Sequence, residues 1–157
     1  MHILIVAHSE IDRHLLRKMC ERLGCTVSTV DHGPRALDFL SNPCQRPDLI
    51  LIDVVDPIMS GPQVTHILRT QPPFTTDAKL QNTPIIGLLE WPGTRGLSED
   101  QRFGFSDFIS KPARISHLRS QLRFWARKEI IPPAGLHGQP DILMRLRRGH
   151  RGPRSRI

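Results

Sequence analysis

The sequence lacks the paired cysteines that mark disulfide frameworks and cysteine-based zinc sites. Its three cysteines, Cys20, Cys25 and Cys44, are odd in number and include no Cys-x-x-Cys spacing. This usage is typical of small buried thiols in a reducing compartment. We therefore expect a soluble, cytoplasmic protein that is stabilised by an ordinary core.

Long hydrophobic runs are also missing. No apolar run approaches the ~20 residues that a transmembrane helix needs. The run over residues 3–7 is too short for a signal peptide and is stopped by polar residues. Nor does the sequence contain a Ser/His/Asp or Cys/His arrangement or a glycine-rich phosphate motif. We expect no membrane span and no independent enzymatic activity.

The chain has 157 residues and a formal net charge of +7, with a basic excess concentrated near its C-terminus. The pattern predicts one domain over residues 1–128 and a basic, Pro/Gly/Arg-rich tail over residues 129–157. The tail holds six arginines against two acidic residues, Glu129 and Asp141. It is expected to be disordered or to form a single short helix. As a binding segment it would suit nucleic-acid phosphates or an acidic protein surface; as a solvated extension it would bind nothing.

Short apolar runs alternate with segments of helical spacing five times along residues 1–128. The predicted strands lie at residues 3–6, 26–30, 49–52, 84–89 and 107–110. Ser9 can cap the first helix, and Ser98 with Gln101 can form a capping box for a short helix before the last strand. Residues 70–83 show no period and are predicted to be a long loop. This alternation predicts an α/β fold with a parallel sheet covered by helices on both faces.

The third strand carries the first candidate for function. Its continuous apolar run over residues 49–52 indicates burial on both faces, and it ends at Asp53. Functional groups of open α/β sheets lie at the carboxyl ends of the strands. Asp53 is either such a group or a residue that merely caps a turn.

Three segments, Ile3–Val6, Asp48–Gly61 and Asp107–Pro112, resemble the receiver domain of bacterial two-component response regulators. The resemblance covers residues 1–128 and implies a flavodoxin-like, doubly wound, five-stranded parallel sheet. It places Asp53 at the phosphoacceptor position and Lys111 at the position that contacts the phosphoryl group. Phe108 matches the aromatic switch position, where the alternative is ordinary core packing.

The sequence departs from this family at the positions that support phosphorylation. The resemblance implies an acidic pair that holds Mg²⁺ after the first strand, but Ala7 and His8 stand there. It implies a Thr or Ser at the end of the fourth strand, but Leu89 stands there, followed by Glu90. Mg²⁺ requires hard oxygen ligands, which Ala does not offer and His replaces with nitrogen.

These departures suggest a degenerate receiver, or pseudo-receiver, of a phosphorelay, in which Asp53 and Lys111 pair permanently. It would need no cofactor and would act by protein–protein contact with a signalling partner such as a histidine kinase or an output protein. One alternative is a working phosphoacceptor that uses Asp53 with an altered metal site. A separate idea is a transition-metal site, for zinc or manganese, made by His8, Asp53 and either Glu10 or Asp56, against which His8 is simply a partly exposed loop residue. Another alternative is a nucleic-acid-associated protein that binds through the basic tail.

Overall fold

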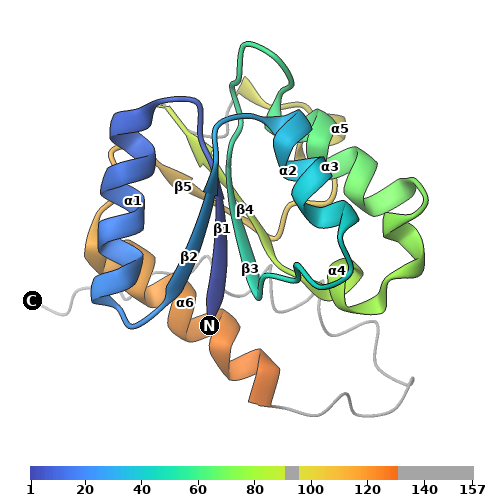
Figure 1. The fold of residues 1–157 in the computed structure, drawn as a ribbon. Coiled ribbons are helices and arrows are strands. Elements are labelled where there is room, and N and C mark those ends of the chain that lie inside the picture. The colour runs from blue at the N-terminus through green and yellow to red at the C-terminus, as the bar shows by residue number, and fades with distance from the viewer. Residues whose placement is uncertain (91–95, 131–157) are drawn as a thin grey trace, which may run out of the picture. The chain divides into compact units, whose positions relative to one another are not determined.

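The computed structural model describes residues 1–90 and 96–130, and within them a five-stranded parallel sheet (Figure 1). The strand order is β2-β1-β3-β4-β5. The strands are β1 (His2–Val6), β2 (Thr26–Val30), β3 (Leu49–Asp53), β4 (Ile85–Leu89) and β5 (Asp107–Ser110). The predicted flavodoxin-like sheet is confirmed.

Helices connect the strands in the order that a doubly wound fold requires. They are α1 (Glu10–Arg22), α2 (Gly33–Ser41), α3 (Gly61–Thr70), the 3₁₀ helix η1 (Phe74–Thr76), α4 (Ala78–Asn82), α5 (Glu99–Arg102) and α6 (Ile115–Ile130). No helix within the described residues is long and apolar enough to cross a membrane. The chain divides into two compact units, Met1–Trp125 and Ala126–Ile157. The predicted tail lies outside the described residues from residue 131 onward.

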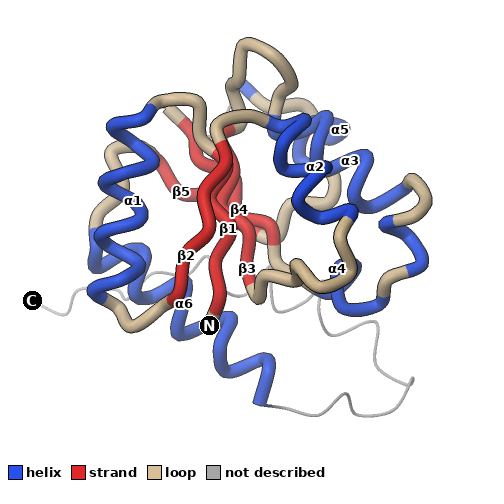
Figure 2. The backbone as a smooth tube through the Cα atoms, viewed as in Figure 1, coloured by secondary structure: helices blue, strands red, loops and turns tan. Residues whose placement is uncertain are grey.

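Helices cover both faces of the sheet (Figure 2). Because successive residues of a strand point to opposite faces, the buried strands build a core on each face of the sheet. Ile3, Ile5, Leu49 and Leu51 face the side covered by α1 and α6. The intervening strand residues face the side covered by α2 and α3, where they pack with Ala36, Leu40, Val64 and Leu68. This alternation decides which helix each residue at a strand end will meet.

The prediction of a structureless loop over residues 70–83 is wrong. The segment forms η1 and α4, and the side chain of Asp77 caps α4 by accepting a hydrogen bond from the Leu80 N–H at 2.9 Å. Five residues with one buried apolar side chain carry no detectable period, so the pattern could not reveal this helix. The Arg69 guanidinium holds the segment by donating to the carbonyls of Leu80, Gln81 and Thr83 at 2.7–2.9 Å. Burial lowers the pKa of Arg69.

All three cysteines are free, but the expectation of buried thiols is met by Cys20 alone. Cys20 is a core-facing residue of α1, Cys25 is half-buried and Cys44 is exposed. Burial raises the pKa of the Cys20 thiol to about 12, so Cys20 stays a protonated core side chain at neutral pH.

Two capping boxes in the chain allow a matched test of helix capping. Ser60 and Gln63 form one at the start of α3, and Ser98 and Gln101 form the predicted one at the start of α5. Helix α3 buries Val64, Thr65 and Leu68, whereas α5 buries no residue. We expect Ser60→Ala to lower the free energy of unfolding by about 1 kcal/mol, measured by urea denaturation. Ser98→Ala should lower the free energy of unfolding by less than about half of that amount, because α5 buries no residue. Equal losses in the two variants would contradict this dependence on burial.

Candidate functional site

Asp53 is the last residue of β3 and points toward the side of the sheet that α1 covers. It shares this side with Leu49 and Leu51 because its position differs from theirs by an even number. Its exposed fraction is only 4%. The backbone N–H of His8 donates to its Oδ2 at 3.3 Å. Asp53 is therefore a buried carboxylate at the carboxyl end of the central strand.

Lys111 reaches the same place from the residue after β5. Its backbone N–H donates to the Leu89 carbonyl at 2.6 Å, and its peptide bond to Pro112 is cis. The ammonium Nζ lies 2.6 Å from Asp53 Oδ1. The structure thus brings together the two residues that the sequence predicts as phosphoacceptor position and phosphoryl-contact position.

Asp12 is a third member of this cluster, which the sequence patterns did not predict. Its Oδ2 lies 3.2 Å from Lys111 Nζ. The residue lies in the first turn of α1, where its own N–H donates to the Ser9 side chain at 3.3 Å. The sequence did contain a signal for Asp12, namely a carboxylate in the first turn of the helix that follows β1. That helix begins at the sheet edge where Asp53 lies.

The cluster places one ammonium between two carboxylates. Burial raises the pKa of Asp53, while the Lys111 ammonium and the His8 N–H oppose the rise and the charge of Asp12 adds to it. Burial lowers the pKa of Lys111, but hydrogen bonds and charges from Asp53 and Asp12 outweigh burial and raise it above its ordinary value. Lys111 is therefore protonated at neutral pH and forms ion pairs with both Asp53 and Asp12.

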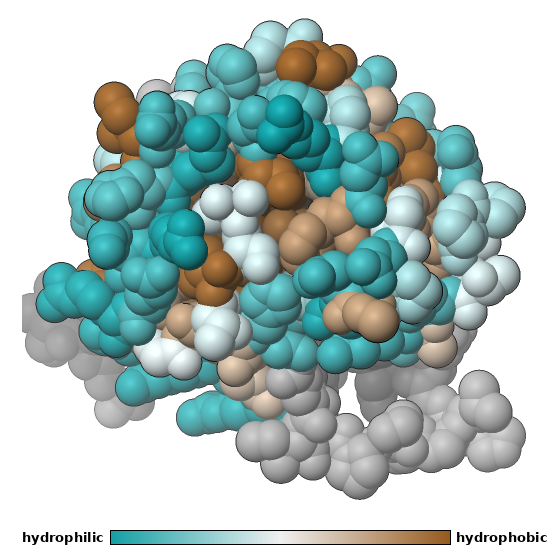
Figure 3. Space-filling view, viewed as in Figure 1, coloured by the Kyte–Doolittle hydropathy of each residue, from teal (hydrophilic) through white to brown (hydrophobic). Residues whose placement is uncertain are grey.

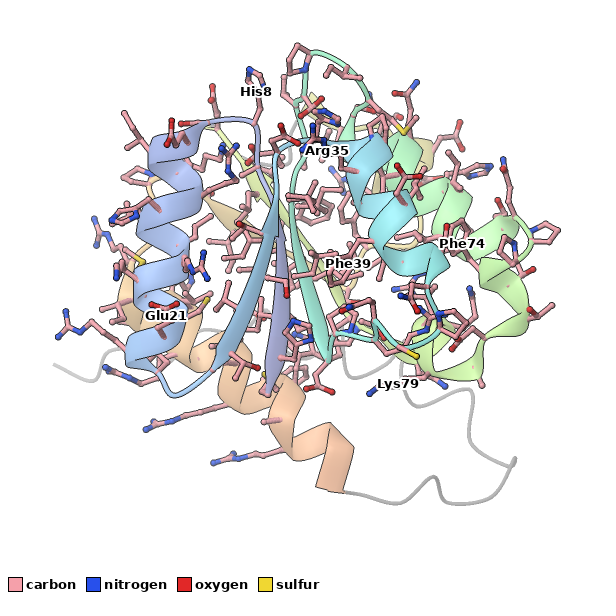
Figure 4. The ribbon with its side chains drawn as sticks, viewed as in Figure 1. His8, Glu21, Arg35, Phe39, Phe74 and Lys79 are labelled. Carbon is pink, nitrogen blue, oxygen red and sulfur yellow. The ribbon has the colours of Figure 1, made fainter. Side chains whose placement is uncertain are left out.

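Ala7 and His8 form the loop where the family resemblance implies the acidic pair. Ala7 is buried against the core and offers no polar side-chain atom. The His8 side chain is exposed and projects outward beyond the strand ends (Figure 4). Arg13 Nη1 donates to the carbonyls of both residues at 2.8 Å. A guanidinium thus binds the backbone oxygens of a loop that carries no carboxylate.

The residues present do not fit a Mg²⁺ site. Within residues 1–90 and 96–130, no three His, Cys, Asp or Glu side chains are grouped to hold a metal ion, and this includes the predicted His8 set. Asp56 Oδ1 accepts the N–H groups of Ile58 and Met59 at 2.8 and 3.1 Å and so closes its own loop. Glu10 is the exposed first residue of α1.

The two remaining predicted positions are apolar. Leu89 ends β4, is 6% exposed and has no hydroxyl to offer a phosphoryl group. The half-buried Phe108 ring stacks on Phe105 at a centroid distance of 4.9 Å. It also covers Gly87, where an added Cβ would lie 2.6 Å from the ring. Phe108 therefore packs over β4, and the absence of a side chain at Gly87 makes room for its ring.

Comparison with known proteins identifies the class. Residues 3–123 match the response regulator receiver domain, and the chain belongs to this family of two-component signalling proteins. It is 31% identical to the transcription factor SKN7 of Saccharomyces cerevisiae over 129 residues, which cover 82% of this chain and 19% of SKN7. It is 29% identical to the polar-differentiation response regulator DivK of Brucella anthropi over 113 residues, which cover 72% of this chain and 85% of DivK.

The lengths of these relatives differ. The chain spans about a fifth of the SKN7 proteins of S. cerevisiae and Candida albicans (19% and 18%). Among solved structures it resembles the receiver domain of the sensor histidine kinase PA1611 of Pseudomonas aeruginosa, which has a magnesium ion coordinated in its active site cleft. That likeness has a TM-score of 0.66 and 27% identity, and covers 79% of this chain and 95% of the other. It also resembles the signal receiver domain of a signal transduction histidine kinase from Syntrophus aciditrophicus. That likeness has a TM-score of 0.65 and 30% sequence identity, and covers 87% of this chain and 98% of the other.

Proposed function

We propose that this receiver domain is a pseudo-receiver, which works by protein–protein contact and takes up little or no phosphate by the Mg²⁺-dependent route. The observation that carries the proposal is the ion cluster in which Lys111 already bridges Asp53 and Asp12. No acidic side chain stands at residues 7 and 8 to recruit a cation. The chain would then bind a partner rather than catalyse a reaction.

The electrostatics of the cluster support this proposal. Phosphoryl transfer depends on positioning and on neutralising the charge of the transferred group, which a bound metal ion supplies in large part. Two carboxylates and one ammonium leave the pocket with a formal charge of −1 before any anionic donor arrives. Leu89 adds no hydrogen-bond donor. Because Lys111 neutralises only one of the two carboxylates of this cluster, an incoming phosphoryl group would meet a net negative charge there.

Exposed apolar side chains near the site support a role in protein contact. Ile11 and Leu15 lie on α1 with exposed fractions of 80% and 45%, and Val55 and Ile58 follow β3 with 78% and 59%. An open groove of about 750 Å³ runs along α1. Figure 3 shows such apolar patches within a largely hydrophilic surface. A signalling partner such as a histidine kinase or an output protein would suit surfaces of this kind.

Incubation with a small phosphoryl donor and Mg²⁺, followed by intact-mass measurement, tests the proposal. We expect the wild-type chain to keep its mass. Under the same conditions, a receiver with a complete acidic pair serves as the positive control. Stoichiometric addition of one phosphoryl group, abolished by Asp53→Asn, would overturn the proposal and establish Asp53 as a working phosphoacceptor with an altered metal site.

A further inference from the structure

The exposed face of α6 carries two arginines, Arg119 and Arg123, that have no acidic partner among the described residues. No Asp or Glu occurs between Pro112 and Lys128. Arg119 and Arg123 are exposed, and neither forms an ion pair in the part of the chain that the structure describes. Unpaired cations on one helix face create a local positive potential that favours an anionic partner.

Helix α1 covers the same side of the sheet and shows the opposite arrangement. Arg17 Nε lies 3.0 Å from the Glu21 carboxylate, and Lys18 Nζ lies 3.9 Å from it. Arg13 is occupied by the backbone carbonyls of the β1–α1 loop. Arg13, Arg17 and Lys18 of α1 are therefore neutralised or engaged, whereas Arg22 at the end of α1 forms no ion pair among the described residues.

An aromatic ring accompanies the arginines on α6. Phe124 remains 50% exposed and packs edge-on against Trp125 at a centroid distance of 4.9 Å. Trp125 Nε1 donates to Gln121 Oε1 at 3.2 Å, and Gln121 Nε2 donates to Asp107 Oδ2 at 2.7 Å. This chain of contacts anchors the neighbour on which the Phe124 ring rests. Gln121 thus engages the Asp107 carboxylate, and no ion pair between Asp107 and an arginine occurs among the described residues.

We infer that Arg119, Arg123 and Phe124 form a binding surface for single-stranded nucleic acid. Residues four apart on a helix lie about 6 Å apart along the axis, so two guanidiniums can contact successive phosphates of an extended strand. An exposed aromatic ring can stack on a base. An interfacial helix would need a broader apolar face, and Phe124 is the only large hydrophobic residue exposed on the described part of α6.

The inference is independent of the proposed function, because no residue of the Asp53–Lys111–Asp12 cluster takes part. It also differs from binding by the tail alone, since these three residues precede residue 129. The sequence repeats the four-residue arginine spacing once more at Arg127.

Fluorescence anisotropy of the full-length chain with a labelled oligothymidylate of about 15 nucleotides tests the inference across a salt series. We expect Arg119→Gln/Arg123→Gln to weaken binding about 20-fold at 0.1 M salt. The slope of log K against log salt should fall by about 1.4, the value for two lost phosphate contacts on a single strand. The matched control, Arg17→Gln/Lys18→Gln, removes the same charge and should change affinity by less than about twofold.

A second pair of variants tests the stacking contact. Phe124→Ala should weaken single-strand binding at least about fivefold, while Phe124→Trp should retain it. Thermal unfolding would verify that each variant is folded. Equal affinity of wild type and Arg119→Gln/Arg123→Gln would overturn the inference and assign binding to the tail. Competition by poly-glutamate as strong as by unlabelled oligonucleotide of equal charge would also overturn it, because poly-glutamate offers no base to stack.

Discussion

Replacing Ala7 and His8 with aspartate is expected to destabilise the protein in EDTA and to make its stability depend on Mg²⁺. The cluster of Asp53, Asp12 and Lys111 has a formal charge of −1, and two further carboxylates at this strand end would bring it to −3. Because Ala7 and Asp53 are buried, we expect the free energy of unfolding to fall by about 3 kcal/mol without a divalent cation.

Addition of Mg²⁺ should reverse this loss in the double variant. A cation that binds the folded state alone stabilises it by about 2.7 kcal/mol at 100 times its dissociation constant. The free energy of unfolding of the wild type should not depend on Mg²⁺ beyond a general salt effect. Urea denaturation of both proteins, once in Mg²⁺ without Ca²⁺ and once in EDTA, measures the difference. Ala7→Asn/His8→Asn separates the added charge from the added volume, since it supplies similar size without new negative charge.

The outcome for wild type decides the interpretation. A Mg²⁺-dependent rise in wild-type stability as large as that of the Ala7→Asp/His8→Asp variant would mean that the natural residues already hold the cation. The same two variants belong in the phosphoryl-donor assay. Gain of phosphorylation in the aspartate variant alone would attribute the defect to the missing acidic pair, whereas Leu89 would be implicated if neither variant reacted.

Lys111→Met should be the most damaging single substitution at the site near neutral pH. The substitution removes the ammonium 2.6 Å from Asp53 Oδ1 and leaves a carboxylate that is 4% exposed without its cation. Loss of one partner of a buried pair costs about 3–5 kcal/mol. Lys79→Met is the matched control, because Lys79 is largely exposed and lies 3.5 Å from Asp48 (Figure 4). It should cost less than about 1 kcal/mol.

The pH dependence of this loss identifies its cause. Burial raises the pKa of Asp53 in the folded wild type, and removal of Lys111 takes away the main opposing influence. A carboxyl whose folded pKa is raised contributes most stability below its unfolded pKa of about 3.9 and loses it as pH rises through the folded value. Lysine stays charged in both states over this window.

The cost of Lys111→Met should therefore be small near pH 4 and grow toward pH 8. Urea denaturation of both proteins at several pH values measures this difference. Asp53→Asn/Lys111→Met should recover most of the stability lost at pH 8, because it removes the unpaired charge. A pH-independent loss that the double variant does not recover would attribute the effect of Lys111 to packing of its side chain.

Much of the architecture is contained in local patterns. Buried strands such as Leu49–Asp53 are short, continuous and bounded by turn residues, so their existence follows from the chain itself. The capping boxes at Ser60 and Ser98 are local in the same way. The helix Ala78–Asn82 was not predictable, because its five residues bury only Leu80 and carry no helical period, and the Arg69 guanidinium that holds its carbonyls belongs to another helix.

The candidate site likewise has features that local sequence determines and features that depend on tertiary contacts. The sequence by itself determined that Asp53 ends the third strand and Lys111 follows the fifth strand of one parallel sheet, and that Ala7, His8 and Leu89 carry no carboxylate or hydroxyl. Only the tertiary structure decided that Asp12 shares Lys111 and that Arg13 binds the Ala7 and His8 carbonyls. The reason is that side-chain alternation in β3 and the direction of α1 must both be known before a helical carboxylate can be placed beside a lysine 99 residues away.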